Sequence, residues 1–253
     1  GEVLRDITRG GLAGAIAGIL VAGVGGRIVM RLAALLVPAA SGGTTENGNR
    51  IGDITLSGSL GLVLIGLVIG LMGGTIWVMV SPWIPGARLA RAILAMPIAV
   101  ALVGNGLIED SNEDFFILRH DPTVVALLVG LVALAGFGIA MIDSWLERRL
   151  PHPRLGRNGV AVSYAVVSLV GAILIAMPVA FSYLGSSDPT MLLRGLTMFA
   201  VAGCTIAWWY RRLQGRADRP MILTAFGRGT LLIAIVVGFA ATLPEIRGAL
   251  GIY

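Results

Sequence analysis

The apolar run from Gly10 to Pro38 constrains the fold of this chain more than any other stretch. A helix needs about 20 mostly apolar residues to cross a hydrocarbon core of about 30 Å, and this run is longer. Arg27 and Arg31 lie within it, and charged side chains inside a bilayer are costly. The run therefore predicts a membrane-spanning helix whose two arginines need a specific environment.

The composition agrees with an integral membrane protein. Of the 253 residues, 56% are hydrophobic and 13% are charged, and the mean hydropathy is +0.88. Soluble domains contain about 25% charged residues. The net charge of +5 does not indicate a nucleic-acid partner, because the basic residues lie mainly in short loops between apolar runs, where they set membrane orientation.

Seven apolar runs predict transmembrane helices. They cover approximately residues 10–38, 58–80, 89–108, 122–146, 160–184, 191–210 and 220–244. Backbone polar groups in hydrocarbon must be satisfied within the protein, and the alternative, a closed barrel, would show alternating strands of about ten residues. We therefore predict an all-α fold with one integral membrane domain over residues 1–253.

The distribution of arginines predicts the orientation. Loops on one side contain twelve: Arg5, Arg9, Arg88, Arg91, Arg148, Arg149, Arg154, Arg157, Arg211, Arg212, Arg216 and Arg219. The other side has Arg50, Arg119 and Arg247 and most of the carboxylates. Because cytoplasmic loops are the arginine-rich ones, we expect the N-terminus inside, the C-terminus outside, and a multi-pass location in a bacterial cytoplasmic (inner) membrane.

A short internal similarity is present. Residues 73–77 read GGTIW, and residues 203–207 read GCTIA and are followed by Trp208. If runs one to three correspond to runs five to seven, the arrangement resembles the three-plus-one-plus-three parallel repeat of sugar-exporting and vitamin-uptake transporters. Small residues beside a tryptophan also recur without a repeat, so both interpretations stay open.

Glycines recur at helix-packing spacing in the first two runs, at positions 14, 18, 66, 70 and 74. Such ladders remove side-chain bulk from one helix face, and close packing within the chain is the expected use. Gly25 and Gly26 differ because they directly precede Arg27, where two glycines can loosen or break the helix.

Arg27 and Arg31 share a helix face, and their depth allows three interpretations. At 1.5 Å per residue from Gly11 they lie roughly 24 Å and 30 Å along the helix, so they could snorkel to the outer headgroups. They could instead form a cationic outer pocket with Arg194, or pair with Glu109 or the acidic loop after it. Asn105, between Gly104 and Gly106, is expected to end the third helix and to contribute to the same outer vestibule.

Arg228 and Asp143 form the second candidate pair. Arg228 lies eight residues beyond Pro220, about 12 Å into the last run, so burial and an acidic partner are expected. Asp143, near the inner end of the fourth run, is the candidate. The pair is either a static ion pair or a gating or proton-coupling pair.

Metal, cofactor and enzyme signals are weak. Asp110, Asn112 and Asp114 match the opening of a calcium loop, but Phe115 occupies the position that needs glycine. The lone Cys204 excludes an intramolecular disulfide and a multi-cysteine metal site. We find no P-loop, HExxH, complete GxGxxG or GxSxG motif, so neither a cofactor nor an enzyme activity is predicted.

Three functions remain in order of preference. The first is a transporter or channel-like protein for a small polar or anionic solute, bound by Arg27, Arg31, Arg194 and Asn105. The second is a non-catalytic subunit or scaffold of a larger membrane complex, docking through glycine ladders and acidic loops. The third is a lipid-modifying enzyme. The expected partners are the bilayer, a small anion or lipid headgroup, and a second copy or another membrane subunit.

Overall fold

The computed structural model describes residues 1–40, 42–43, 56–108, 113–152, 162–166, 189–216 and 218–252, and the regular elements in these ranges are all helical. They are α1 (Glu2–Ala17), the π-helical η1 (Gly18–Gly25), α2 (Gly26–Leu36), η2 (Pro38–Ala40), α3 (Leu56–Val80), η3 (Ser81–Trp83), α4 (Arg88–Val103), η4 (Gly104–Gly106), α5 (Glu113–Ile117), α6 (Pro122–Arg149), α9 (Pro189–Leu213) and α10 (Met221–Ala249). The predicted all-α fold is confirmed for this part of the chain.

In the described part of the chain, five helices are long and apolar enough to cross a membrane: Glu2–Leu36, Gly58–Trp83, Pro122–Arg149, Pro189–Leu213 and Met221–Ala249. The chain is thus a multi-span membrane protein. Large apolar side chains such as Leu64 and Ile233 are exposed on these helices, as expected for surfaces that contact lipid.

The other two predicted spans are not established. The third run corresponds to α4, whose 16 residues extend only about 24 Å. The run at 160–184 lies largely outside the described residues. Seven spans, the internal repeat and the membrane orientation therefore stay predictions.

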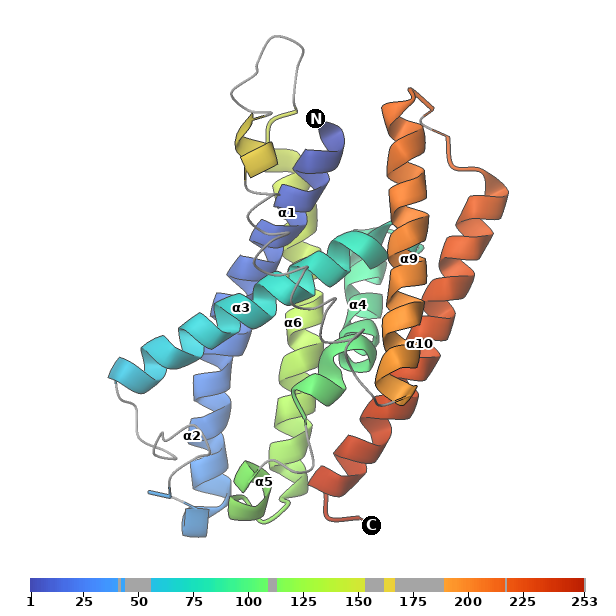
Figure 1. Ribbon diagram of the computed structural model, residues 1–253. Coiled ribbons are helices and arrows are strands. Elements are labelled where there is room, and N and C mark those ends of the chain that lie inside the picture. Colours follow the sequence, from blue (N-terminus) through green and yellow to red (C-terminus); the bar gives the residue numbers. More distant parts are fainter. Residues whose placement is uncertain are drawn as a thin grey trace.

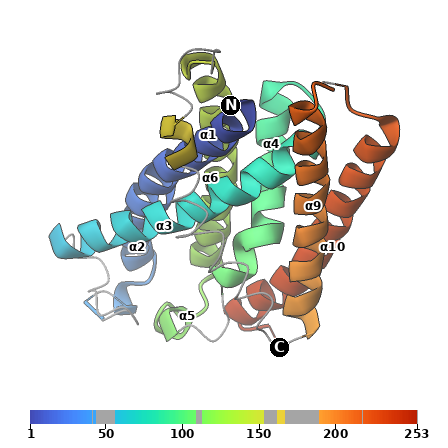
Figure 2. The ribbon, with the colours of Figure 1, turned by 45° about the horizontal axis from the view of Figure 1, so that its top comes forward.

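The helices form a bundle whose two chain ends lie at opposite ends (Figure 1). α1, η1 and α2 make one continuous helix, α3 crosses it obliquely, and α9 and α10 lie side by side as a hairpin (Figures 1 and 2). The C-terminal ends of α6 and α9 lie at the same end of the bundle as the N-terminus. The arginine-rich turns of the described chain therefore gather at one end.

The crossing of α1 and α3 depends on the predicted glycine ladders. A Cβ atom on Gly14 would overlap the carbonyl oxygen of Gly70, and one on Gly70 would overlap that of Gly14. Gly18 and Gly66 block each other in the same way. Any side chain here would push the helices apart, so the expected close packing within the chain is confirmed.

The helix is not broken at Gly25 and Gly26, which both have right-handed helical dihedral angles. Instead, the preceding residues Gly18–Gly25 are wound as a π-helix. The expected loosening thus occurs one turn earlier and over a longer segment, where η1 packs against α3 and α6.

Trp83 fixes the α9–α10 hairpin to the turn after α3. Its side chain is 1% exposed, and its Nε1 donates to Thr205 Oγ1 on α9 at 2.9 Å. Thr205 Oγ1 in turn donates to the carbonyl of Met79 at 2.6 Å. The indole ring also covers Gly227 on α10, where a Cβ atom would overlap it. This contact determines where the arginines of α9 and α10 lie relative to α1.

Candidate functional site

A cavity of about 700 Å³ opens at the arginine-rich end of the bundle. Helices α1, α6, α9 and α10, the start of α4 and the turn after α3 contribute its walls. Its charged lining consists of Arg5, Arg9, Arg91, Arg212, Arg219 and Arg228 together with Glu2, Asp6, Asp143 and Glu147. Among the described residues, these arginines divide into a group that contacts carboxylates and a group that does not.

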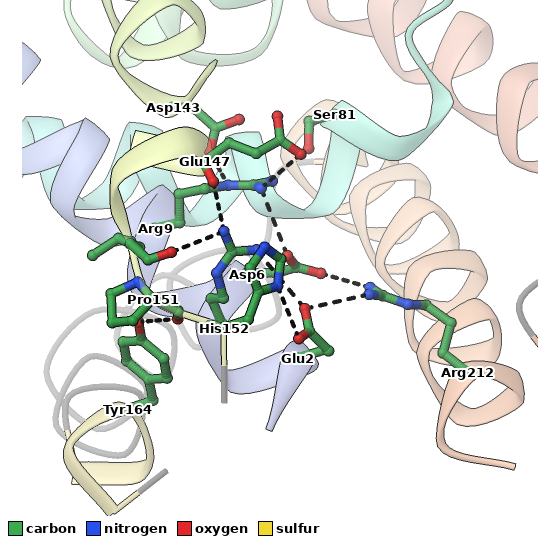
Figure 3. Close-up of polar contacts among 12 residues, drawn as sticks. Glu2, Asp6, Arg9, Ser81, Asp143, Glu147, Pro151, His152, Tyr164 and Arg212 are labelled. Carbon is green, nitrogen blue, oxygen red and sulfur yellow. Dashed lines mark hydrogen bonds and ion pairs between the residues drawn. The ribbon is translucent and has the colours of Figure 1, made fainter. Parts of the chain in front are cut away.

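Arg9 is the centre of the ion-paired group (Figure 3). Its Nε lies 2.7 Å from Oδ1 of Asp143, and its Nη1 lies 3.2 Å from Oε1 of Glu147. The Arg9 side chain is 13% exposed and that of Asp143 is 5% exposed. The charge-assisted hydrogen bond between them connects α1 to the last turns of α6.

Arg212 joins α9 to α1 at the same end. Its Nη1 lies 2.7 Å from Oδ2 of Asp6, and its Nη2 lies 4.0 Å from Oε2 of Glu2 (Figure 3). Arg5 donates to the carbonyls of Glu147 at 2.6 Å and Leu150 at 3.2 Å. Together these contacts hold three helices across one side of the cavity.

Arg91, Arg219 and Arg228 form the second group, which we call the free arginines. Within the described ranges, no carboxylate lies within 4.0 Å of any of them. Arg91 Nη2 donates to the Ser81 carbonyl at 2.8 Å, and Arg219 Nη1 donates to the Pro82 carbonyl. These neutral acceptors position the guanidiniums but do not compensate their charges.

Aromatic rings support the same arginines. The guanidinium of Arg219 lies 4.5 Å from the Trp208 ring centroid, and that of Arg212 lies 4.8 Å from it. Arg91 lies 5.8 Å from the centroid of Trp77. Cation–π contacts of this kind hold a guanidinium in place without neutralising it.

The free arginines repel one another. Partial burial, followed by the charges of Arg91, Arg212 and Arg228, lowers the pKa of Arg219 below the usual arginine value. The group stays charged at neutral pH. An anion among these guanidiniums would relieve the repulsion, since an opposite charge favours the protonated form.

Several N–H donors on cavity-lining residues also lack an acceptor among the described residues. Arg91 Nε, Trp208 Nε1 and Trp209 Nε1 are buried without a hydrogen-bond partner in the described structure. A buried polar group left unpaired costs about 1–3 kcal/mol. The cavity thus combines uncompensated positive charge with unused donors, which is the arrangement expected of an anion-binding site.

The predicted pairing of Asp143 with Arg228 is corrected by the structure. Both residues line the cavity, but the partner of Asp143 is Arg9, because α1 packs beside α6 at this level. Arg228 lies on α10, lines the cavity and is exposed rather than buried. The last span therefore carries its arginine in contact with the polar cavity, where the cost of a buried charge does not arise.

The residues of the predicted outer site lie away from the arginine-rich cavity. Arg27 is half-buried and Arg31 is exposed on α2, whereas Arg194 is buried on α9 and donates to the carbonyl of Leu102 at 3.1 Å. None of the three lines the arginine-rich cavity. Arg27 is 18 residues from Arg9 along the continuous helix of α1, η1 and α2, and Arg194 is 18 residues from Arg212 along α9. Each separation corresponds to roughly 25 Å.

Two further predictions concern the opposite end. α4 ends at Val103 and is followed by the 3₁₀ turn Gly104–Gly106, so the predicted helix end around Asn105 is confirmed. Asp110 and Asn112 lie outside the described residues, and the calcium hypothesis, which also needs the side chain of Asp114, stays untested.

Sequence reasoning did not identify Arg9, Arg91 and Arg219 as site residues. It assigned them to orientation, which is the usual role of loop arginines. One available signal was the run of three aromatic residues followed by two arginines in Trp208-Trp209-Tyr210-Arg211-Arg212. That pattern places aromatic rings and cations at the same membrane boundary.

No protein-family model matches the chain, and neither a curated protein nor a solved structure is significantly similar to it. The geometry of the cavity therefore carries the functional argument.

Proposed function

We propose that this multi-span membrane protein is a transporter of a small anionic solute, which binds in the arginine-rich cavity. The observation that carries the proposal is the group of free arginines, three guanidiniums in one cavity that have no carboxylate partner among the described residues. The site replaces the outer pocket of Arg27, Arg31 and Arg194 as the preferred binding site. A cationic ligand is disfavoured, because each carboxylate that lines the cavity already has an arginine within 4.0 Å.

The size and position of the cavity support a small solute. About 700 Å³ lies within the range of typical ligand pockets. Arg219 and Arg228 are exposed, so an anion can reach them from the aqueous side. Trp77 lines this cavity and also a second, apolar cavity of about 290 Å³ between α3, α4 and α6. A solute that moves from the arginine-rich cavity into the apolar cavity would pass Trp77.

The contacts of the α9–α10 hairpin support a transport movement. At the arginine-rich end, Arg212 connects the hairpin to α1 through Asp6 and Glu2. In the proposed mechanism, rearrangement of these ion pairs lets the hairpin move against the crossed pair α1 and α3. Such a rigid-body movement around a fixed site is the usual basis of alternating access.

A scaffold role has less support. It requires the glycine ladders as docking surfaces, but Gly14, Gly18, Gly66 and Gly70 cover one another within the chain. The prediction that the chain is not an enzyme remains part of the proposal.

Flux through reconstituted protein tests the proposal. The full chain is placed in liposomes, and uptake of labelled inorganic phosphate, sulfate, succinate and acetate is compared with that of protein-free liposomes. The variant Arg91→Gln/Arg228→Gln should lose protein-dependent uptake. The matched control is Arg148→Gln, because Arg148 is an exposed arginine at the same end that does not line the cavity.

Equal thermal stability of the two variants would show that both are folded. Protein-dependent uptake that survives in the double variant would reject the cavity as the site. Absence of uptake of every anion by the parent protein, with partner subunits retained on mild extraction, would favour the scaffold.

A further inference from the structure

We infer that the group recognised in the cavity is a doubly charged tetrahedral oxyanion of the phosphate-monoester type, held by Arg91, Arg219 and Arg228. This inference rests on the proposed function, because it names the chemical class of the solute.

The charge balance gives the ligand charge. Among the residues that the structure describes, six arginines and four carboxylates line the cavity, which leaves an excess of two positive charges. The carboxylates contact arginines of the paired group, so the excess is concentrated at the free arginines. A monocarboxylate would compensate half of it, whereas a phosphate-monoester dianion compensates it fully.

The donors fit an acceptor with several oxygens. Each guanidinium has five N–H donors, and Arg91 and Arg219 each use one nitrogen on a backbone carbonyl. Arg91 Nε and the indole N–H groups of Trp208 and Trp209 are buried without an acceptor in the described ranges. A planar carboxylate offers two oxygens, but a phosphate monoester offers three strong acceptors.

The donors also come from different elements. Arg91 belongs to the first turn of α4, Arg219 to the connection before α10, and Arg228 to α10 itself, while Trp208 and Trp209 extend from α9. Donors that come from several separate elements suit an acceptor with several oxygens. Trp208 and Trp209 place the site at the headgroup level of a bilayer, so the phosphate could belong to a soluble metabolite or to a lipid.

Ligand-induced stabilisation tests the inference. The melting temperature of the purified full chain is measured with glycerol 3-phosphate, sulfate, succinate and acetate at matched ionic strength, because a ligand of the native state raises it. We expect glycerol 3-phosphate and sulfate to stabilise the protein at pH 7.5. Arg228→Gln should weaken the affinity for both by about tenfold or more, and Arg148→Gln should leave it unchanged.

Lowering the pH separates ligand titration from protein titration. The second pKa of a phosphate monoester is about 6, so its dianion is largely lost at pH 5, and its affinity should fall by about tenfold. Sulfate keeps both charges, and it therefore reports any change from Glu2, Asp6, Asp143, Glu147 or His152, the titratable groups of the cavity besides the arginines. An equal fall for both ligands would overturn the phosphate assignment.

Nanodiscs identify the source of the phosphate. Stabilisation by glycerol 3-phosphate in neutral-lipid nanodiscs would support a soluble monoester. Stabilisation by phosphatidate but not by phosphatidylglycerol, whose phosphate is a singly charged diester, would support a lipid headgroup. Stabilisation by succinate or acetate alone would overturn the inference while keeping an anion transporter. No effect of any anion would reject both.

Discussion

Arg9 Nε and Asp143 Oδ1 lie 2.7 Å apart, although their residues are 134 positions apart in the chain. The contact connects the third turn of α1 with the last turns of α6, and both side chains are largely buried. Arg9 also contacts Glu147 at 3.2 Å. Removing Arg9 and removing Asp143 should therefore have unequal effects on stability.

Arg9→Gln should destabilise the protein more than Asp143→Asn. The first leaves a buried carboxylate without its cation, which costs about 3–5 kcal/mol, whereas the second leaves Arg9 paired with Glu147. The double variant should lose less free energy of unfolding than the two single variants together, with a coupling energy of about 1–3 kcal/mol. Additive effects in unfolding experiments in mixed micelles would contradict the pair.

The length and hydropathy of the apolar runs predict the helices of the chain more directly than they predict the contacts between those helices. The predicted run at 122–146 corresponds to α6 (Pro122–Arg149), and the run at 220–244 corresponds to α10 (Met221–Ala249). A stretch of this length and hydropathy has few alternatives to a helix in hydrocarbon. The partner of Asp143 depends instead on which helix packs beside α6, and no local pattern contains that information.

The glycine ladders and the cavity illustrate the same difference. Gly14 and Gly70 could be predicted as packing positions because their spacing already defines a helix face. Arg91, Arg219 and Arg228 come from separate segments and converge only after Trp83 has fixed the hairpin against the turn that follows α3. The sequence assigns Arg91 and Arg219 to membrane orientation and Arg228 to an ion pair with Asp143, so it predicts no shared site.

Gly70→Ala should destabilise the protein by about 1–3 kcal/mol, because the added methyl group overlaps the backbone of Gly14 and forces α1 and α3 apart. Gly61→Ala is the matched control on the same helix, where a Cβ atom meets nothing within 4 Å. It should be neutral or stabilising by up to about 1 kcal/mol, since alanine favours helix. Equal melting temperatures for the two variants would contradict the crossing.

Gly227→Ala should loosen the α9–α10 hairpin. The added methyl group overlaps the Trp83 ring, which is fully buried and cannot move aside. We expect a loss of about 1–3 kcal/mol in unfolding free energy and faster proteolysis between residues 214 and 220. Gly229→Ala on the same helix has open space and should behave like the parent protein. Indistinguishable proteolysis of the two variants would argue against this anchoring contact.

Cysteine labelling tests the orientation of the arginine-rich end. Cys204 is the lone natural cysteine and is buried, so Cys204→Ala provides a background without thiols. Arg148 in the last turn of α6 and Ile252 after α10 are both exposed. The end of α6 and the C-terminus lie at opposite ends of the bundle (Figure 1). If the arginine-rich end is cytoplasmic, a membrane-impermeant maleimide added to intact cells should label Ile252→Cys and should label Arg148→Cys only after permeabilisation. The reverse pattern would place the arginine-rich cavity on the outer face, and the proposed transporter would then meet its solute outside the cell.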